Sequence, residues 1–247
     1  MRGEPSLQTV MEEYLDIEVM HPGGLDITRE LARMCDVGPS KRVLDNSAGT
    51  GESAIHLAET FGCQVVGVEL SRDLVERARR KLEGRDLPVE FREGSAHRLP
   101  FEDGSFDIVL SEFSLSLMDK ERAIREMKRV LRKGGMLGFH DVCWKKEAPR
   151  WAMEELMRVE SARPETAQGW EEMVRGEGLK EIRTMDRPNL ISKWIRKLFK
   201  DLGMFGQLDL MSKARRRWGL KGYMAIRRSR RIYKRWMDYL VVVGKKE

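Results

Sequence analysis

The chain is poor in several residue types, and each shortage excludes a class of protein. Its 247 residues include three cysteines, Cys35, Cys63 and Cys143, which are widely spaced. An odd number of cysteines without a C-x-x-C pair excludes a disulfide framework and a zinc cluster of that type. We therefore expect no metal ion and a reducing, cytoplasmic compartment. No apolar run approaches the roughly 18 residues of a membrane span, and no early segment has the layout of a signal peptide.

Amide side chains are also scarce, since only six residues are Asn or Gln, whereas Lys, Arg and Glu abound. This balance is typical of proteins from hot environments. Hydrophobic residues make up 41% of the chain and charged residues 35%. That composition is globular, with more charge than is usual, and it argues against a disordered chain.

The charge is divided unevenly along the chain. Residues 191–247 hold 17 Lys or Arg and four acidic residues, so they carry about +13, whereas the whole chain carries +6. Residues 1–190 therefore carry about −7. This asymmetry predicts two electrostatically different parts.

Apolar runs alternate with helical stripes from residue 41 to residue 142. The expected strands are residues 42–45, 64–70, 89–92, 106–111 and 136–142. The expected helices are residues 52–61, a helix capped by Ser71, and a helix capped by Asp119 that ends at Gly134 and Gly135. This alternation requires crossover connections, so it predicts a doubly wound, Rossmann-like α/β fold with helices on both faces of a mostly parallel sheet.

The turn between the first strand and the first helix is rich in small residues, V-L-D-N-S-A-G-T-G at residues 43–51. Such a turn presents free backbone N–H groups at the carboxyl edge of the sheet, and Gly49 and Gly51 permit close approach of a ligand. The second strand ends with Glu69, whose carboxylate is suited to ribose hydroxyls. These features predict a site for a nucleoside cofactor.

The details of the loop separate two kinds of cofactor. A dinucleotide loop reads G-x-G-x-x-G, whereas this one reads D-x-S-x-G-x-G and begins with Asp45. It resembles motif I of the class I S-adenosylmethionine-dependent methyltransferases. Two later strings, G-S-A-H-R-L-P-F-E-D-G-S-F-D-I-V at residues 94–109 and E-M-K-R-V-L-R-K-G-G at residues 126–135, resemble the type 11 group related to the ubiquinone and menaquinone C-methyltransferases.

The resemblance implies a cofactor, S-adenosylmethionine, and roles for individual residues. Asp45 would contact the methionine ammonium group, Glu69 the ribose, and Leu70 and the backbone of Ala96 the adenine. Two positions depart from the pattern, because Ser47 replaces a glycine and Ser95 replaces an aspartate. The full predicted cofactor set is Tyr14, Asp45, Ser47, Gly49, Gly51, Glu69, Leu70, Ser95, Ala96 and Ser111.

A sulfonium methyl group is already activated, so a base is needed only when the acceptor must lose a proton. The candidates lie at the carboxyl ends of the fourth and fifth strands, with Ser111 and Ser114 beside them. His140 has a side chain suited to proton transfer near neutral pH. The predicted catalytic residues are Glu112, His140 and Asp141. The motifs of base-modifying amino methyltransferases and of cytosine C5 enzymes are missing at these strand ends.

The resemblance also divides the chain into parts. Residues 1–40 would form an N-terminal helical cap in which Tyr14 and His21 close the pocket. Residues 41–185 would form the cofactor-binding core. The last two of seven strands would be residues 179–185 and 240–245, with residues 240–247 as the final core segment. A basic helical lid, residues 186–239, would separate them.

The predicted function is methyl transfer from S-adenosylmethionine to a small-molecule or lipid/quinone-like acceptor. The basic segment, residues 191–239, has apolar stripes suited to an anionic acceptor or to peripheral contact with a membrane. RNA methylation is an alternative, because Arg and aromatic residues also suit phosphates and stacked bases. A non-catalytic protein that binds the cofactor is a second alternative.

Overall fold

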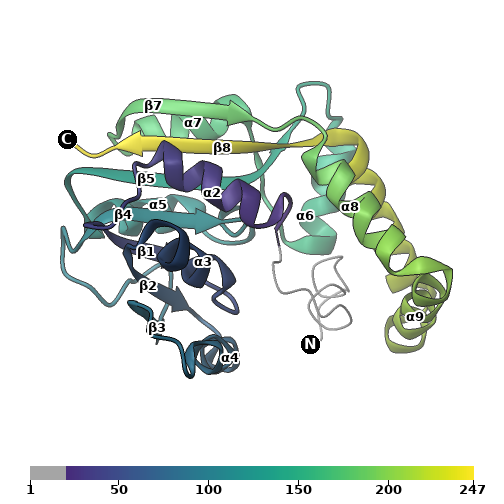
Figure 1. Ribbon diagram of the computed structural model, residues 1–247. Coiled ribbons are helices and arrows are strands. Elements are labelled where there is room, and N and C mark those ends of the chain that lie inside the picture. The colour runs from purple at the N-terminus through teal and green to yellow at the C-terminus, as the bar shows by residue number, and fades with distance from the viewer. Residues whose placement is uncertain (1–20) are drawn as a thin grey trace.

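The structure is a computed structural model that describes residues 21–247, apart from the side chains of residues 214 and 218. The sheet has the strand order β3-β2-β1-β4-β5-β8-β7, with β6 beside β5 (Figure 1). The strands are β1 (Arg42–Asn46), β2 (Gln64–Glu69), β3 (Val89–Glu93), β4 (Phe106–Glu112), β5 (Leu131–Trp144), β6 (Glu165–Thr166), β7 (Lys180–Asp186) and β8 (Met237–Lys245). The helices are α2 (Gly24–Met34), α3 (Glu52–Phe61), α4 (Arg72–Leu82), the 3-10 helix η1 (Leu115–Leu117), α5 (Lys120–Val130), α6 (Arg150–Glu160), α7 (Ala167–Gly176), α8 (Leu190–Asp201) and α9 (Gly203–Trp236).

The strand directions confirm the predicted mostly parallel sheet. Strands β1 to β5 pair in parallel, β8 runs antiparallel to β5, and β7 runs antiparallel to β8. The β7 strand therefore points the same way as the first five, and its carboxyl end lies at their carboxyl edge. The polypeptide leaves this edge after β7 and must return to it before β8.

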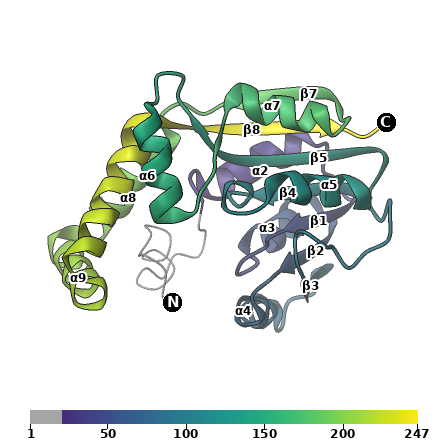
Figure 2. The same cartoon turned by 180° about the vertical axis from the view of Figure 1, so that it is seen from behind.

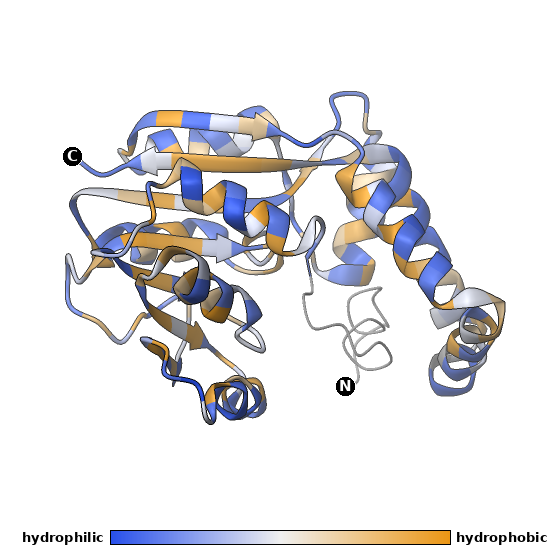
Figure 3. Ribbon diagram, viewed as in Figure 1, coloured by the Kyte–Doolittle hydropathy of each residue, from blue (hydrophilic) through white to orange (hydrophobic). Residues whose placement is uncertain are grey.

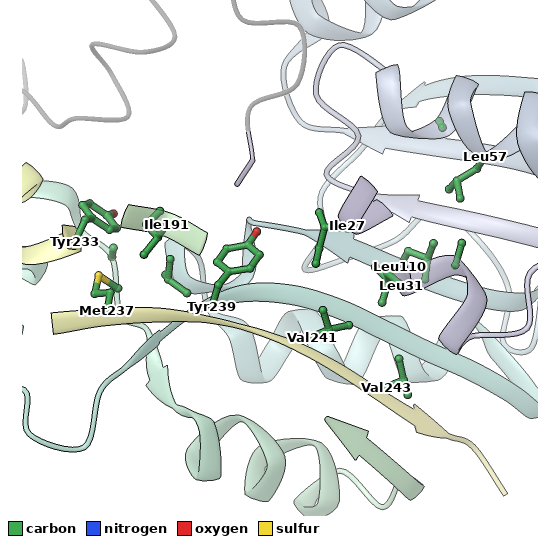
Figure 4. Close-up of a cluster of buried hydrophobic side chains, with 14 of the residues drawn as sticks. Ile27, Leu31, Leu57, Leu110, Ile191, Tyr233, Met237, Tyr239, Val241 and Val243 are labelled. Carbon is green, nitrogen blue, oxygen red and sulfur yellow. The ribbon is translucent and has the colours of Figure 1, made fainter. Parts of the chain in front are cut away.

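Helices cover both faces of the sheet, as the sequence predicted. Figure 1 shows α2 and α3 on one face, and Figure 2 shows α5 and α7 on the other. On the first face, Ile27 and Leu31 of α2 pack with Val241 and Val243 of β8 (Figure 4). On the second face, the ring centroids of Phe139 and Trp170 lie 5.2 Å apart. Each face therefore has its own buried core.

Two predicted helix caps are confirmed. The Ser71 hydroxyl accepts a hydrogen bond from the backbone amide of Leu74 at 3.4 Å, and the Asp119 carboxylate accepts one from Arg122 at 3.1 Å. Each bond satisfies a backbone donor that the first helical turn leaves free. The caps fix where α4 and α5 begin.

The starts of two strands differ from the prediction, and two elements were not expected. Strand β5 begins at Leu131, and Gly134 and Gly135 lie inside it rather than ending the preceding helix. The register between β4 and β5 shifts at this point, since Phe106 pairs with Leu131 and Ile108 pairs with Met136. Strand β8 begins at Met237, three positions before the expected residue. The two-residue strand β6 and helix α6 were not predicted.

The predicted helical insertion between the last two strands is confirmed. Helices α8 and α9 lie with α6 beyond the carboxyl ends of β4 and β7 (Figures 1 and 2). Hydrophobic residues (orange) and hydrophilic residues (blue) alternate along these helices in Figure 3. Ile195 and Phe199 are buried in the expected stripe of α8. Helix α9 bends at Gly219, whose backbone leaves the helical region with φ 68° and ψ −169°.

Two contacts fasten α9 to α6. The Tyr233 hydroxyl donates a hydrogen bond to Glu160 at 3.4 Å, and the Arg228 guanidinium pairs with Glu155 at 3.2 Å.

Among the described residues, no helix is long and apolar enough to span a bilayer.

Candidate active site

The loop between β1 and α3 is held against the end of β2. The backbone amides of Ser47 and Ala48 both donate to the carbonyl oxygen of Val68, at 2.8 and 3.0 Å. Ser47, Gly49 and Gly51 all have positive φ angles, of 71°, 55° and 82°. Ser47 therefore adopts the left-handed conformation that glycine takes more readily. Although Ser47 stands where the motif usually has its first glycine, the backbone keeps the conformation of a tight loop.

The two glycines of the loop meet different surroundings. A Cβ atom on Gly51 would lie 2.4 Å from the Phe91 ring and 2.9 Å from Ala78, so no side chain fits there. Among residues 21–247, a Cβ atom on Gly49 would meet nothing within 4 Å. Gly51 therefore serves the packing of α3 and α4 on the sheet. Gly49 leaves open space over the loop, and a ligand can approach its backbone.

Glu69 lies beside this loop and is bonded to it. One carboxylate oxygen accepts a hydrogen bond from the Gly49 amide, and the other accepts one from the Ser71 amide, both at 3.0 Å. The next residue, Leu70, is 71% exposed. An exposed apolar side chain at a strand end, next to an acid, offers a surface on which a flat base can lie.

Ser95 and Ala96 follow β3 and lie close to the end of β2. The amide of Gly94 donates to the carbonyl oxygen of Glu69 at 3.0 Å, which brings the two strand ends together. The Ser95 hydroxyl accepts a hydrogen bond from the His97 amide at 3.2 Å. The Ser95 side chain therefore stabilises its own turn.

Two polar side chains at the end of β1 are buried without full hydrogen bonding. Asp45 is 2% exposed and Asn46 is 0% exposed. Among the described residues, Oδ2 of Asp45 and both side-chain amide atoms of Asn46 have no hydrogen-bond partner. Buried polar groups are costly when unpaired, so such atoms commonly mark a place where a ligand completes the bonding.

Glu112, at the end of β4, is the centre of a buried polar cluster. Its Oε2 atom lies 2.8 Å from Nε2 of His21 and accepts hydrogen bonds from the hydroxyls of Ser53 at 2.7 Å and Thr28 at 3.0 Å. Nε2 of His140 lies 3.5 Å from the same oxygen. Strand pairing explains the last contact, because Glu112 and His140 are register partners on β4 and β5. The second oxygen, Oε1, is buried and has no partner among the described residues.

The carboxyl groups of the site titrate abnormally. Burial, followed by the charges of Glu112 and Glu69, raises the pKa of Asp45 well above its usual range. Burial also opposes ionisation of Glu112, but the charges and hydrogen bonds of His21 and His140 outweigh it and hold the pKa of Glu112 well below its usual range. The two neighbouring acids thus have pKa values moved in opposite directions, a pattern typical of functional sites.

His140 is fully buried, and burial lowers the pKa of its imidazole. Its Nδ1 atom lies 2.7 Å from the hydroxyl of Tyr239 on β8, which fixes the orientation of the ring. Asp141 is not part of this cluster, because successive strand residues point to opposite faces. Its carboxylate accepts hydrogen bonds from the amide and the hydroxyl of Ser116, at 2.9 and 2.8 Å.

The structure thus brings together Glu112 and His140 from the predicted catalytic set, and it places Asp141 on the other face of β5. Ser111 is buried, and its hydroxyl lies 2.7 Å from that of Ser114. Tyr14 lies outside the described residues. Sequence reasoning missed Asn46 at the end of β1 and the following residues that contact Glu112 or His140: Thr28, Ser53 and Tyr239. Asn46 could have been found, because it follows Asp45 directly and ends β1.

Comparisons with known proteins identify the family. The family model described as "Methyltransferase domain" matches residues 44–139. An uncharacterised protein of Haemophilus influenzae is 30% identical over 79% of this chain and 80% of its own. The chain belongs to the class I S-adenosylmethionine-dependent methyltransferases. A sarcosine/dimethylglycine N-methyltransferase of Halorhodospira halochloris is 32% identical to this methyltransferase, over 67% of this chain and 61% of that enzyme.

A solved structure shares the fold of this methyltransferase. Haemonchus contortus phosphoethanolamine N-methyltransferase 2, in complex with phosphomonomethylethanolamine and S-adenosylhomocysteine, superposes with a TM-score of 0.78 at 18% identity. The match covers 97% of this chain and 56% of the Haemonchus chain. This chain therefore spans little more than half of that protein and about three-fifths of the Halorhodospira enzyme.

The residues of this site fit the family cofactor, S-adenosylmethionine. The molecule carries an ammonium group, and a buried carboxyl with an unpaired oxygen, Asp45, is present at the loop. The open space over Gly49 and the exposed Leu70 leave room for the rest of the molecule. The Asp45 carboxyl, the space over Gly49 and the Leu70 side chain are thus complementary to the charge and shape of the cofactor.

Proposed function

We propose that this methyltransferase transfers the methyl group of S-adenosylmethionine to a small-molecule or lipid-like acceptor at the carboxyl edge of β1 and β4. The observation that carries the proposal is the pair of buried, incompletely bonded carboxyls, Asp45 and Glu112, beside the loop of residues 43–51. One carboxyl is suited to the cofactor and the other to the acceptor.

The cofactor side follows from the geometry of the loop. Asp45 would bind the methionine ammonium group through its unpaired Oδ2 atom, and the positive charge would lower the raised pKa of this carboxyl. Glu69 would exchange its bond to the Gly49 amide for bonds to the ribose hydroxyls. Leu70 would contact the adenine ring, and Ala96 would offer its backbone amide to the same ring.

The acceptor side follows from the Glu112 cluster. The cofactor supplies a methyl group already activated by a sulfonium, so the protein must align the acceptor and exclude water. Glu112 and His140 would hold the acceptor through the atoms left unpaired, Oε1 and Nε2. The neutral imidazole of His140 would take the proton of an acceptor that loses one, because burial lowers its pKa.

Helix α8 would act as a lid over this acceptor side. The ring of Trp194 on α8 lies 6.2 Å from the ring of Phe113, which directly follows Glu112. Phe113 lies in turn 6.0 Å from Tyr239. An acceptor bound beside Glu112 would therefore meet aromatic side chains, which favours a partly apolar molecule over a highly polar one.

The surface of α9 favours a lipid-like or anionic acceptor over RNA. Many of the exposed large apolar side chains lie on this helix, and basic residues surround them. They are Met204, Phe205, Leu208, Leu220 and Met224. Exposed apolar side chains among basic ones suit the interface of an anionic membrane, whereas RNA binding has no need of them. Peripheral contact of a cytoplasmic enzyme with such a surface would bring it to the acceptor.

The cofactor part of the proposal is tested by calorimetric titration with S-adenosylhomocysteine. Wild-type protein should bind one molecule per chain, and the exposed-loop control Asp86→Asn should bind equally well. The acceptor part is tested with cell extract and isotopically labelled S-adenosylmethionine, with the product located by mass spectrometry. Glu112→Gln should keep S-adenosylhomocysteine binding and lose most label transfer. Absence of cofactor binding by the wild type would overturn the proposal.

Two measurements distinguish the acceptor classes. Sedimentation with vesicles of anionic phospholipid should retain the protein, and the double variant Phe205→Ser/Leu208→Ser should weaken this retention. Binding to RNA with a steep salt dependence, without vesicle binding, would favour the RNA alternative instead.

A further inference from the structure

We propose that His21, Glu112 and His140 form a binding site for one divalent transition-metal ion of the zinc type. The site goes beyond the proposed methyl transfer, for which the cofactor alone supplies the activated group. It also runs against the sequence expectation that the protein binds no metal. The histidines and the glutamate come from three distant parts of the chain, and folding brings them together.

The geometry of the cluster fits a single small ion. One ligand atom from each of His21, Glu112 and His140 can be chosen so that all lie within 4.8 Å of one another. His21 is 6% exposed, His140 is 0% exposed and the Glu112 side chain is 5% exposed. Two imidazoles and one carboxylate are a ligand set of catalytic zinc sites, and such a set leaves a coordination position open. An ion at this position would be shielded from bulk water.

Atoms without a partner provide a second, independent observation. Nδ1 of His21, Oε1 of Glu112 and Nε2 of His140 are buried, and none has a hydrogen-bond partner among the described residues. One such atom falls on each of the three residues. Glu112 Oε2 and His140 Nε2 also approach to 3.5 Å, which is a stretched distance for a direct hydrogen bond. Of the three unpaired atoms, Nε2 of His140 is the one that faces the Glu112 carboxylate, so a cation between these two side chains would satisfy it.

The surrounding groups hold the ligands as metal ligands are usually held. Nδ1 of His140 lies 2.7 Å from the Tyr239 hydroxyl, and in a metal-bound form its N–H group would donate to that oxygen, which would leave the lone pair of Nε2 facing the cluster. The hydroxyls of Ser53 and Thr28 donate to the Glu112 carboxylate. Hydrogen bonds of this kind fix the tautomer of a histidine ligand and the direction of a carboxylate ligand.

The charges near the cluster also favour a cation. The side chains of Asp45 and Glu112 are both buried, and the charge of Glu112 disfavours ionisation of Asp45. The ion-pair partners of Glu112 within residues 21–247 are the two histidines, and no lysine or arginine pairs with it there. The ammonium group of the cofactor can balance Asp45. A divalent ion would balance Glu112. With the ion bound, Nε2 of His140 would be a metal ligand instead of a base, and an acceptor oxygen or nitrogen at the open position would lose a proton more readily because of the ion.

The site is tested by titrating Co²⁺ into the full chain after treatment with a chelator. The visible absorption of Co²⁺ reports coordination by nitrogen ligands, and competition with Zn²⁺ then gives the zinc affinity. We expect one ion per chain. Glu112→Gln and His140→Gln should each lower the affinity at least tenfold, and Tyr239→Phe should lower it less. His56→Gln is the matched control and should leave the affinity unchanged, because His56 lies outside the cluster.

Thermal unfolding and S-adenosylhomocysteine binding show whether each variant is folded. A wild-type protein that binds no Co²⁺ or Zn²⁺ would overturn the site, and so would folded Glu112→Gln and His140→Gln variants with wild-type metal affinity. The outcome is separate from that of the proposed function. Label transfer by a protein that binds no metal would leave the methyl transfer standing and remove the metal site. If the wild type binds metal, the variants abolish that binding and no label is transferred, the metal site would stand and the proposed methyl transfer would be contradicted.

Discussion

The Glu69 carboxylate accepts a hydrogen bond from the backbone amide of Gly49 at 3.0 Å. Its other oxygen accepts one from the Ser71 amide, also at 3.0 Å. One side chain at the end of β2 therefore joins the glycine loop after β1 to the cap of α4. The residue that we propose to hold the ribose also shapes the loop that faces it.

Replacing Glu69 should weaken the cofactor site. A hydrogen bond to a charged group contributes about 1.5–3 kcal/mol, so Glu69→Ala should lower the affinity for S-adenosylhomocysteine about 10- to 100-fold. Glu69→Gln should lie between this variant and the wild type, because its amide oxygen can still accept a bond. Calorimetric titration gives the affinities, with Glu76→Ala on the exposed side of α4 as the control. Equal affinities for the wild type and Glu69→Ala would contradict the assignment.

Gly49 and Gly51 should respond differently to alanine. Gly51→Ala places a Cβ atom 2.4 Å from the Phe91 ring at a φ of 82°, so it should destabilise the fold by about 2–4 kcal/mol. The added methyl group of Gly49→Ala meets no atom of the described part of the chain within 4 Å, so this variant should cost only about 1 kcal/mol for its positive φ. It should nevertheless weaken S-adenosylhomocysteine binding, because its methyl group enters the cofactor space. Denaturant unfolding and calorimetry measure the two effects, and equal stability of both variants would contradict the argument.

The central fold was predictable because its signals are local. Strands β1, β2 and β4 are short apolar runs. Ser71 caps α4, and Asp119 caps α5. Strand β5 was harder to delimit. Glycines normally end helices, but Gly134 and Gly135 lie in an irregular strand segment that long-range pairing determines.

The cofactor loop could be predicted, but the Glu112 cluster could not be predicted as a unit. The loop is one continuous motif, whereas His21, Thr28 and Tyr239 lie far from Glu112 in the chain. Their meeting depends on how α2 packs across β5 and β8, and on the antiparallel register that places Tyr239 diagonally across from His140. Sequence order gives the strand ends that share an edge, but it does not give side-chain distances between elements.

Ser47→Gly should leave the cofactor site intact and relax the loop. Ser47 has a φ of 71°, a conformation that costs an ordinary residue about 1–2 kcal/mol more than glycine. The substitution gives the unfolded chain more freedom, which offsets part of this gain. We expect unchanged or higher stability and unchanged or tighter binding of S-adenosylhomocysteine. A tenfold loss of affinity would show that the serine hydroxyl itself binds the cofactor.

Asp45→Asn should separate stability from binding. The raised pKa of Asp45 means that its ionised form is disfavoured without the cofactor, so a neutral amide should not destabilise the free protein. The same change removes the partner of the ammonium group and should weaken S-adenosylhomocysteine binding at least tenfold. Binding to the wild type requires release of the Asp45 proton, so its affinity should rise with pH until that pKa is passed. The affinity of Asp45→Asn should lack this dependence, and a shared pH profile would contradict the role of Asp45.

Asp141 should make the fold less stable as the pH rises. Burial raises its pKa from an ordinary value near 3.8 to about 6, even though Ser116 and Val142 donate hydrogen bonds to it. The folded protein therefore binds this proton more tightly than the unfolded chain does. The contribution is fully present below about pH 4 and is lost as the pH rises through about 6. Two pKa units correspond to about 3 kcal/mol. Unfolding free energies of the wild type and Asp141→Asn, measured from pH 4 to pH 7, should differ by a pH-dependent amount of this order, whereas a constant difference would show that Asp141 keeps an ordinary pKa.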